Sequence, residues 1–576
     1  MHISKISVHS FRSINDAEIP IGKITALVGE NNAGKSSLLR ALNAFFNFKE
    51  ESQYFVDGKH AYSNYSKPKV EIIFEDIPND QHLLHLTQNG NIHIEFTCKN
   101  GTDKPIYRYK SNNRFNALDV ATFEKIKKHI DFVLIPPSRD LNKLKWTENA
   151  LLKELVEVFL QNATKSRDVL SSPFLKATRD IERNALNKIA KKIQSAYATH
   201  HNYNFSLRYN TNISYSDFLT NIQFLLKEKT GEFDLVDCGT GIQSLSIIAM
   251  YRVLSDLKHK NVVIGLEEPE TNLHPQAQRE FIRDLSSRMG TDNCCQAIFT
   301  THSTVIIDQL QHEQIVLFRK VADEHRQCGF RTEANYITDS FWGKYDLDEF
   351  KYYQFHRFKN SEMFFAKYAI IVESKNETQV IQKIVSDSGY QINMEGISII
   401  SLDGVDNIKY PYYLLKELSI PFLTIVDKDH FLPYQNDSLE NSRDSNGFPK
   451  YKNEYKPDSL INEMIPNKRD RDNLLNYLRS NHTKALDLLL RHNVICMKNS
   501  LEIDLVSSAK GCELYYSRLK IPADRQNKHE LLVANHKSIK KIGNILEVLK
   551  QIPDSSLPLS YSRIRRAIIA IIKEIS

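Results

Sequence analysis

The chain has 576 residues and a net charge of +6, with 41% hydrophobic and 25% charged residues. This composition excludes an intrinsically disordered chain and leaves room for roughly two to four domains. The seven cysteines form no CxxC pair and are odd in number, which excludes a disulfide framework and fits a reducing cytoplasm. The start, MHISKISVHSFRS, has no apolar signal region, and AIIAIIKEI is too short to span a bilayer, so we expect a cytoplasmic protein with no membrane partner.

The first part of the chain alternates predicted strands and helices. HISKISVHSF reads as a strand, and ITALVGENNAGKSSLLRALNAFF reads as strand, glycine loop and helix. KVEIIFED, NIHIEFTC and HIDFVLIPP are further strands, and the helices GIQSLSIIAMYRVLSDL and QAQREFIRDLSSRM alternate with the strands NVVIGLEE and CQAIFTTHS. This order predicts an α/β ATPase domain with a largely parallel sheet over residues 1–145 and 215–345. Residues 146–214 between them have helical spacing and are predicted to form a helical insertion.

A second alternation follows an aromatic and charged tract, which we interpret as a linker over residues 346–365. YAIIVES, GISIISLDG and PFLTIVDKD are strands, separated by the helices NETQVIQKIVSDS and YPYYLLKELS. Residues 366–576 are therefore predicted to be a smaller α/β domain with a mostly helical end, interrupted by a strand at NVICMKNSLEIDL. From residue 505 onward there are 13 Lys and Arg against 6 Asp and Glu. That excess fits a polyanionic partner and an ordinary solvated helix surface about equally.

A phosphate-binding loop is predicted at GENNAGKS, residues 29–36, because it matches GxxxxGKS between a strand and a helix. A long chain can also match by chance, but here the context is the one that the motif requires. The backbone N–H groups of such a loop point at phosphates, the lysine neutralises the β- and γ-phosphates, and the serine hydroxyl binds Mg²⁺. The predicted ATP-binding residues are Gly29, Asn31, Asn32, Gly34, Lys35, Ser36 and Ser37.

The partner carboxylates are predicted at the end of the strand NVVIGLEE. Glu267 can reach the Mg²⁺ of ATP together with Ser36, and Glu268 can polarise the attacking water. His302 follows a later strand, where it can sense the γ-phosphate. A lone histidine is more often structural, but this one follows both phosphate motifs in the expected order.

These motifs, with Pro269-Glu270 and NLHP at residues 272–275, resemble the ATP-binding-cassette ATPases of the RecF and SMC type. CGTGIQSL resembles a degenerate form of that family's LSGGQ signature. The resemblance implies that the signature contacts ATP bound to another subunit, so the protein would be at least a dimer. No heptad run is long enough for SMC arms. The signature residues that the resemblance adds to the ATP-binding set are Gly239, Thr240, Gly241 and Gln243.

Four carboxylates follow predicted strands of the second domain. Glu373 ends one strand with Glu377 four residues on, and Asp427 and Asp429 end another. Two residues at i and i+2 on a strand point the same way, and parallel strands gather such groups at their carboxyl ends. A solvated strand end is the commoner reading for one pair, but two pairs in adjoining units favour a shared cation site. Oxygen ligands suit Mg²⁺ or Mn²⁺, and two ions could activate a water and stabilise the leaving 3′-oxygen of a phosphodiester.

VES…E followed by DGVDN and VDKD resembles the Toprim domain, with Ser374 where that family usually has glycine. An ATPase of the RecF type followed by a Toprim domain resembles the OLD family of ATP-dependent nucleases, in which the helical insertion serves dimerisation. The resemblance further implies that Glu502 and Asp504 are metal ligands. It also implies that Lys541, with Lys540 as a close rival, stabilises charge on the scissile phosphate.

The resemblance implies a metal-dependent DNA endonuclease or nickase that carries an ATPase. Its cofactors would be ATP and Mg²⁺ or Mn²⁺, with two ions in the Toprim site and one bound with ATP. Its substrate would be double-stranded phage or plasmid DNA, and its role bacterial anti-phage defence. A homodimer or homotetramer is expected. Family members include the Gabija nuclease subunit and retron effectors, which suggests a helicase, or a reverse transcriptase with its non-coding DNA, as a further partner.

Two rival functions stay open at the level of the sequence. One is an ATP-gated DNA-binding or repair clamp like RecF, whose Toprim domain is catalytically silent. The other is a topoisomerase or primase, which also use Toprim domains. However, no separate DNA-binding domain with a nucleophilic tyrosine is evident, and the cysteines offer no zinc module.

Overall fold

The computed structural model describes residues 1–63, 65–137, 151–162, 176, 179–196, 225–228, 231–238, 240–258, 261–288, 296–323, 329–355, 360–402 and 407–575. The chain forms two compact units. The first unit comprises Met1–Leu27, Asn32–Gln309 and Lys320–Glu333, and the second comprises Val28–Asn31, Leu310–Arg319 and Ala334–Ser576. None of the helices within the described ranges is long and apolar enough to cross a bilayer.

A sheet of twelve strands runs in the order β7-β6-β5-β4-β1-β2-β14-β13-β3-β12-β11-β8 among the described residues. The strands β3, β12, β11 and β8 pair in parallel, as the alternation of strands and helices predicted. The strands from β7 to β2 pair antiparallel, so the sheet is mixed and not largely parallel. The bounds of the twelve strands are β1 His2–Phe11, β2 Ile14–Pro20, β3 Ile24–Gly29, β4 Lys69–Glu75, β5 Ile92–Cys98, β6 Pro105–Ser111, β7 Arg114–Leu118, β8 Ile130–Ile135, β11 Asn261–Glu267, β12 Gln296–Thr300, β13 Ile315–Ala322 and β14 Phe330–Tyr336.

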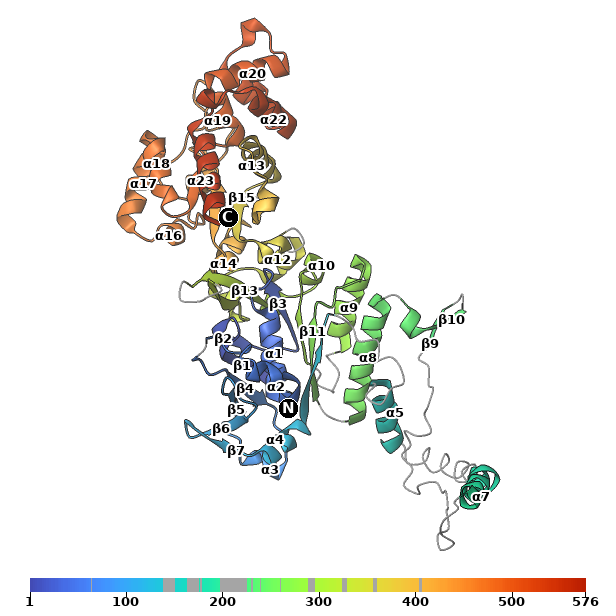
Figure 1. The fold of residues 1–576 in the computed structure, drawn as a ribbon. Helices are drawn as coiled ribbons and strands as arrows, with labels where there is room; N and C mark the ends of the chain where they lie inside the picture. Colours follow the sequence, from blue (N-terminus) through green and yellow to red (C-terminus); the bar gives the residue numbers. More distant parts are fainter. Residues whose placement is uncertain are drawn as a thin grey trace. The chain divides into compact units, whose positions relative to one another are not determined.

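Helices α8 and α9 lie beside β11 in the first unit, whereas α1 follows the buried strand β3 (Figure 1). Helix α1 begins at Lys35, after the loop that follows β3, and buries ten of its residues in the first unit. The other elements of this unit are α2 Phe48–Val56, α3 Gln81–Leu84, α4 Val120–Lys127, α5 Leu151–Asn162, η2 Glu182–Leu186, α7 Asn187–Ala196, β9 Leu225–Glu228, β10 Gly231–Asp234, η4 Leu235–Asp237, α10 Thr304–Ile307, and the helices already named, α1 Lys35–Phe46, α8 Thr240–Lys258 and α9 Pro275–Arg288.

The predicted helical insertion is described in part. Helix α5 lies against α8, and the Asn162 side chain donates a hydrogen bond of 2.6 Å to the carbonyl oxygen of Leu257. The first helix of the insertion therefore packs on helix α8 of the same unit. Much of residues 138–224 lies outside the described residues, so dimerisation through the insertion stays a prediction.

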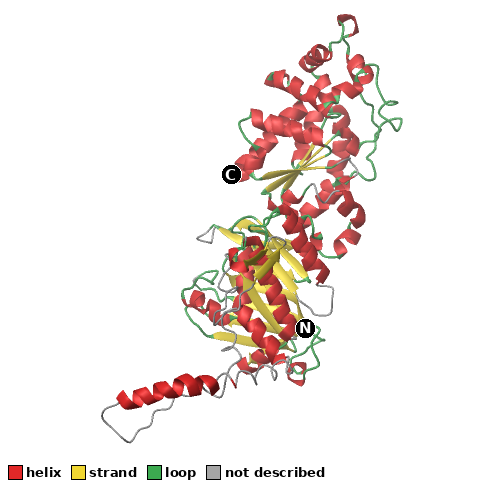
Figure 2. Cartoon of the chain, turned by 90° about the vertical axis from the view of Figure 1, so that its right-hand side faces the viewer, coloured by secondary structure: helices red, strands yellow, loops and turns green. Residues whose placement is uncertain are grey.

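The second unit is built on four parallel strands in the order β16-β15-β17-β18, with helices around them (Figure 2). The strands and helices predicted between residues 368 and 426 are confirmed. The elements are η5 His312–Gln314, α11 Ser340–Lys344, α12 Glu349–Phe355, η7 Ser361–Phe365, β15 Tyr368–Val372, α13 Lys375–Asp387, η8 Ile392–Glu395, β16 Ile397–Ser401, α14 Lys409–Glu417, β17 Phe422–Val426, α15 Lys428–Phe431, α16 Ile461–Met464, α17 Lys468–Ser480, α18 His482–Leu490, β18 Val494–Cys496, α19 Leu501–Ser507, α20 Ala509–Leu519, η10 Ala523–Arg525, η11 Glu530–Ala534, α21 His536–Ile539, α22 Ile542–Gln551, η12 Asp554–Ser556 and α23 Leu559–Ile575.

Two features of the second unit differ from the sequence prediction. The strand expected over NVICMKNSLEIDL ends at Cys496, and SLEIDL begins helix α19 instead. The segment expected to be a linker is largely folded. It contains α12 and the short helix η7, and Tyr352, Met363 and Phe364 are buried because they pack into the second unit.

Candidate functional site

The predicted phosphate loop joins β3 to α1. Gly34 stands at φ +102°, and a Cβ atom there would lie 2.5 Å from Oγ1 of Thr332, so only glycine fits. The Thr332 hydroxyl donates to the carbonyl oxygen of Ala33 at 2.9 Å, which ties the loop to strand β14. Lys35 is buried at the start of α1, whereas Ser36 is exposed beside it. Of the other predicted ATP-binding residues in this loop, Asn31 and Asn32 are exposed, and Gly34 and Ser37 are buried.

Glu267, Glu268 and His302 lie at the ends of the strands β11 and β12, of which β12 pairs with β3 and β11 pairs with β12. Glu267 is buried as the last residue of β11, and Glu268 follows at φ +46°, with its N–H donating to the Thr300 carbonyl oxygen at 3.2 Å. His302 follows β12. Partial burial and then the neighbouring Lys35 lower the pKa of His302, so its imidazole is neutral at pH 7. The fold thus brings these three side chains and Lys35 to one edge of the sheet.

Sequence reasoning gave no site role to Glu270 or Thr332. The N–H of His302 donates to Oε1 of Glu270 at 2.6 Å, so Glu270 fixes the histidine loop. Burial raises the pKa of Glu270. Glu270 lies inside a recognised motif and could have been found from it, but Thr332 comes from a distant strand and carries no local signal.

The residues that resemble a signature motif begin helix α8. Gln243 is buried, and its side-chain amide donates to the carbonyl oxygen of Leu235 at 3.3 Å. Thr240 is the first residue of the helix and Gly241 the second, and Gly239 lies outside the described residues. Contact of these residues with ATP on another subunit stays a prediction.

The carboxylates of the second unit meet at the ends of the neighbouring strands β15 and β17. Ligand oxygens of Glu373, Asp427 and Asp429 all lie within 4.8 Å of one another. The backbone N–H of Asp427 donates to Oε1 of Glu373 at 2.9 Å, which joins the two strand ends. The strand stops at Val426, and Asp427 occupies the N-cap position of the short helix α15, which contains Asp429. The extended geometry expected for the two aspartates is therefore wrong, although their carboxylates still converge with Glu373.

Burial makes ionisation of these acids costly. It raises the pKa of Glu373 to about 8, with the negative charge of Asp429 as the next cause. Burial also raises the pKa of Asp427 well above its usual range, and Glu373 and Glu377 add to that effect. The donors are oxygen atoms only, and a divalent cation would offset their mutual repulsion. The cluster therefore fits Mg²⁺ or Mn²⁺.

Ser374, the residue after Glu373, holds the side chain of Glu377 by a hydrogen bond. Its hydroxyl donates to the Glu377 carboxylate and accepts the N–H of Asn376, so the residue caps helix α13. The serine that replaces the family's usual glycine thus fixes the position of an acid. Burial raises the pKa of Glu377 in spite of this hydrogen bond.

Glu502 and Asp504 point to different surroundings, because residues at i and i+2 on a helix are about 200° apart. Glu502 acts electrostatically on Asp427 and Glu377. Asp504 is fully buried, and its carboxylate accepts hydrogen bonds from the N–H groups of Lys498 (2.8 Å) and Asn499 (2.9 Å). A third bond comes from the Ser560 hydroxyl (2.7 Å). These bonds use both oxygens of Asp504 and do not favour a metal-ligand role.

The two candidate lysines also differ. Nζ of Lys540 lies 3.9 Å from Oε1 of Glu502, and the Lys540 carbonyl oxygen accepts from the side chain of Asn376 at 3.2 Å. Lys541 is exposed at the start of α22. The geometry therefore places Lys540, the rival in the sequence prediction, next to the acids.

Tyr434 lies near the cluster and was missed in the sequence, where it is one of 26 tyrosines. Burial and then the negative charge of Asp429 raise the pKa of Tyr434, so its hydroxyl lies within electrostatic reach of that carboxylate. Its ring stacks on Tyr451 with centroids 5.4 Å apart, and Nζ of Lys428 lies 4.8 Å from the centroid of Tyr451. This stack holds the hydroxyl of Tyr434 beside the carboxylate.

The first unit has a phosphate loop, with acids and a histidine at the ends of adjacent parallel strands, and this defines a P-loop ATPase. The second unit has a carboxylate cluster at the ends of parallel strands, and this defines a Toprim-type fold. Residues 1–149 and 126–307 match the AAA ATPase domain family, and residues 364–429 match the TOPRIM domain of overcoming-lysogenization-defect-like proteins. The chain belongs to the AAA ATPase domain family and carries an OLD-like TOPRIM domain, which confirms the resemblance to the OLD family.

Named relatives agree with this assignment. The chain is 25% identical over 447 residues to the OLD nuclease of Thermus scotoductus, covering 74% of this chain and 82% of that one. It is 22% identical over 475 residues to the Old nuclease of Escherichia phage P2, covering 74% and 77%. It is 27% identical over 181 residues to endonuclease GajA of Bacillus cereus, covering 29% and 26%. An SMC head domain bound to the C-terminal winged helix of ScpA aligns over 59% of this chain and 99% of its own length. Its identity is 16% and its TM-score 0.39.

Proposed function

We propose that the protein is an ATP-hydrolysing, divalent-metal-dependent DNA endonuclease or nickase. The observation that carries the proposal is the convergence of Glu373, Asp427 and Asp429 within 4.8 Å, in a domain of the OLD-like TOPRIM family. Relatives named as nucleases support it. The expected biological role is anti-phage defence, with ATP binding in the first unit regulating cleavage in the second.

Each acid has a role that follows from its position. Glu373, Asp427 and Asp429, with Glu377 and Glu502 beside them, would hold two Mg²⁺ or Mn²⁺ ions. Such ions supply an activated water and stabilise the leaving 3′-oxygen when they are bound. The ligand geometry would be fixed in advance, because the N–H of Asp427 bonds to Glu373 and the Ser374 hydroxyl bonds to Glu377.

A lysine beside the acids would neutralise the phosphate that is cut. Lys540 is the better placed residue because it already contacts Glu502, although the sequence favoured Lys541. Separate Lys540→Ala and Lys541→Ala variants decide between them, since only loss of the phosphate lysine lowers the cleavage rate while metal binding is retained. Asp504 has the role of a positioning residue for the Lys498–Asn499 loop.

In the first unit, Lys35 would hold the β- and γ-phosphates of ATP, and Ser36 and Glu267 would bind the third Mg²⁺ ion. Glu268 would orient the attacking water and His302 would contact the γ-phosphate. A second copy of the chain would complete the site through the signature residues, in a homodimer or homotetramer. A helicase or a reverse transcriptase with its non-coding DNA is a partner to look for among neighbouring genes.

The test uses supercoiled plasmid with Mg²⁺ or Mn²⁺. The full chain and an Asp472→Ala control, which removes an exposed aspartate from the same unit, are expected to nick the plasmid. Asp427→Ala is expected not to do so. Nicking by Asp427→Ala would refute the site. Absence of cleavage by the unaltered chain across metals, nucleotides and substrates, with DNA binding retained, would favour the ATP-gated clamp.

A further inference from the structure

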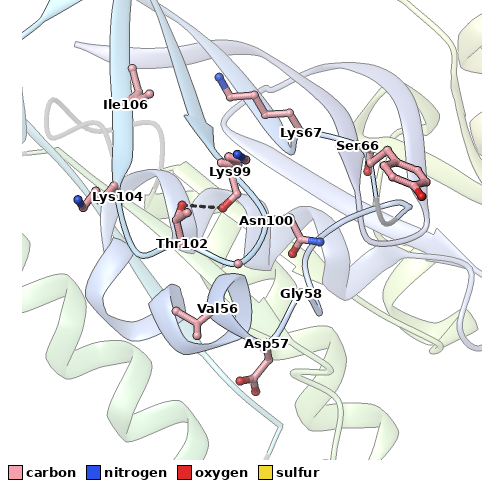
Figure 3. Close-up of a pocket in the computed structure, with 12 residues that line it drawn as sticks. Val56, Asp57, Gly58, Ser66, Lys67, Lys99, Asn100, Thr102, Lys104 and Ile106 are labelled. Atoms are coloured by element: carbon pink, nitrogen blue, oxygen red, sulfur yellow. Dashed lines mark hydrogen bonds between the residues drawn. The ribbon is translucent and has the colours of Figure 1, made fainter.

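A hollow lined by lysines lies at one end of the antiparallel strands of the first unit. The strands β4, β5 and β6 are neighbours, so the start of β4, the end of β5 and the start of β6 meet at the same edge of the sheet. Lys67 precedes β4, Lys99 follows β5 and Lys104 precedes β6. The topology therefore gathers three ammonium groups around one hollow, which the end of α2 closes at Val56 (Figure 3).

The lysines around this hollow outnumber the nearby acids, which are Asp57 and, in the loop between β5 and β6, Asp103. All three side chains are exposed, and none takes part in an ion pair within the described part of the chain. Nearby lysines differ: Lys59 lies 2.9 Å from Asp57, and Lys69 lies 2.6 Å from Glu71. Asp57, the acid that lines the hollow, is thus already paired, and the hollow keeps a positive potential that suits an anion.

The same hollow exposes apolar and aromatic surface. Val56, the last residue of helix α2, is 45% exposed, and Ile106 in strand β6 is 43% exposed. Tyr65 is fully exposed on the segment that leads to Lys67. An ion-binding surface needs only the lysines, so the apolar wall and the free aromatic ring point to a ligand that also has a flat apolar part.

The hollow is preformed by hydrogen bonds within the loop between β5 and β6 and from that loop to helix α2. The N–H of Gly101 donates to the Phe55 carbonyl oxygen at 3.0 Å, and the Thr102 hydroxyl donates to the Lys99 carbonyl oxygen at 2.7 Å. Gly58 stands at φ +72°, with Asn100 3.0 Å from where a Cβ atom would be. Little ordering of the backbone is therefore needed when a ligand binds.

We propose that this hollow binds a single strand of nucleic acid, with backbone phosphates on Lys67, Lys99 and Lys104 and an unstacked base against Tyr65 and the apolar wall. Lysines that follow a phosphate backbone next to an aromatic platform are the chemistry by which proteins hold single strands. A duplex keeps its bases stacked and would leave the aromatic ring and the apolar wall unused. That the strand is DNA rests on the proposed function, and the hollow deepens it by adding a contact for unpaired DNA.

The experiment measures binding of the full chain to fluorescein-labelled oligothymidylate of about 20 nucleotides in EDTA by anisotropy, at several salt concentrations. Lys67→Glu/Lys104→Glu is compared with Lys23→Glu/Lys128→Glu, which reverses two exposed lysines elsewhere in the first unit. We expect the first pair to weaken binding at least about tenfold and to lower the salt slope by about 1.4, for two lost contacts to single-strand phosphates. The control pair should leave both quantities close to those of the unaltered chain.

Variants at Tyr65 distinguish the contribution of base stacking to strand binding from the contribution of the lysine charges. Tyr65→Ala should weaken binding about tenfold at every salt concentration, and Tyr65→Phe should not, because the ring is kept. Equal losses in both lysine pairs, or a Tyr65→Ala variant that binds normally, would overturn the proposal. So would a loss seen for duplex but not for oligothymidylate.

The proposal and the proposed function can fail separately. If the chain binds a single strand through Lys67 and Lys104 but never cuts plasmid, the binding proposal stands and the nuclease proposal is refuted. If the chain cuts plasmid but binds a single strand equally well without both lysines, the nuclease proposal stands and the binding proposal is refuted.

Discussion

Asp504 offers a sharp test of how the second unit works, because the resemblance to the OLD family implies that it is a metal ligand, whereas its contacts predict a structural role. Its carboxylate accepts from Lys498, Asn499 and Ser560, and it is fully buried. We expect Asp504→Ala to destabilise the second unit and to leave its metal requirement within about twofold of the unaltered chain.

The magnitude follows from the three donors and the buried charge. Three donors, two of them buried and the Lys498 N–H partly buried, would be left without an acceptor, which costs about 2 kcal/mol each or about 6 kcal/mol together. Burial raises the pKa of Asp504 from 3.8 to about 6. At pH 8 the ionised carboxylate therefore costs the folded chain about 3 kcal/mol, which the alanine variant recovers. The net loss of stability is about 3 kcal/mol at pH 8.

The sign of the pH effect also follows. A carboxyl whose pKa is higher in the folded state stabilises below its unfolded pKa, and that stability is lost as the pH rises through about 6. The loss caused by Asp504→Ala should therefore be about 1 kcal/mol larger near pH 5 than at pH 8. Urea unfolding at both pH values measures this difference.

Hydrogen exchange gives the local readout, since the amides of Lys498 and Asn499 should lose protection. Asp429→Ala is the positive control for metal binding, because this carboxylate belongs to the three-acid cluster. The reasoning is refuted if Asp504→Ala unfolds like the unaltered chain but needs about tenfold more Mg²⁺, as Asp429→Ala should.

Three further outcomes are expected. Burial and the neighbouring Lys428 lower the pKa of His482 to about 4, so the folded chain holds the imidazole neutral and the free energy of unfolding falls as the pH drops below about 6.5. His482→Leu should recover about 2 kcal/mol of that free energy near pH 5 in urea unfolding. A variant that loses as much stability in acid as the unaltered chain would contradict this. Tyr434→Phe removes the hydroxyl within electrostatic reach of Asp429 and should raise the Mn²⁺ concentration for half-saturation about tenfold in a direct binding titration, whereas an unchanged value would rule out a positioning role. Lys35→Ala should abolish ATP hydrolysis while the fold, followed by circular dichroism, stays intact; hydrolysis at the unaltered rate would refute the nucleotide site.

Local patterns in the sequence were enough to find most of the candidate site. The phosphate loop needs glycine at a fixed position, and Glu373 and Asp427 follow short apolar runs, so these residues carry signals within a few positions of themselves. The direction of Asp504 depends on whether SLEIDL is a strand or a helix. In the helix, the Asp504 carboxylate accepts a hydrogen bond from a distant residue, Ser560, and no local pattern reports that contact. The position of Tyr434 near Asp429 is likewise set by the tertiary fold.

The two sites gather acids in the same way but differ in how the charge is balanced. In the first unit, Arg12 and Arg40 lie within electrostatic reach of Glu267, so the chain carries its own cations near the strand end. In the second unit Lys456 acts on Glu373, yet burial still raises the pKa of Glu373 to about 8. The protein's own cations therefore leave this cluster short of positive charge. A divalent cation would supply it, and removal of metal should then weaken the second unit more than the first.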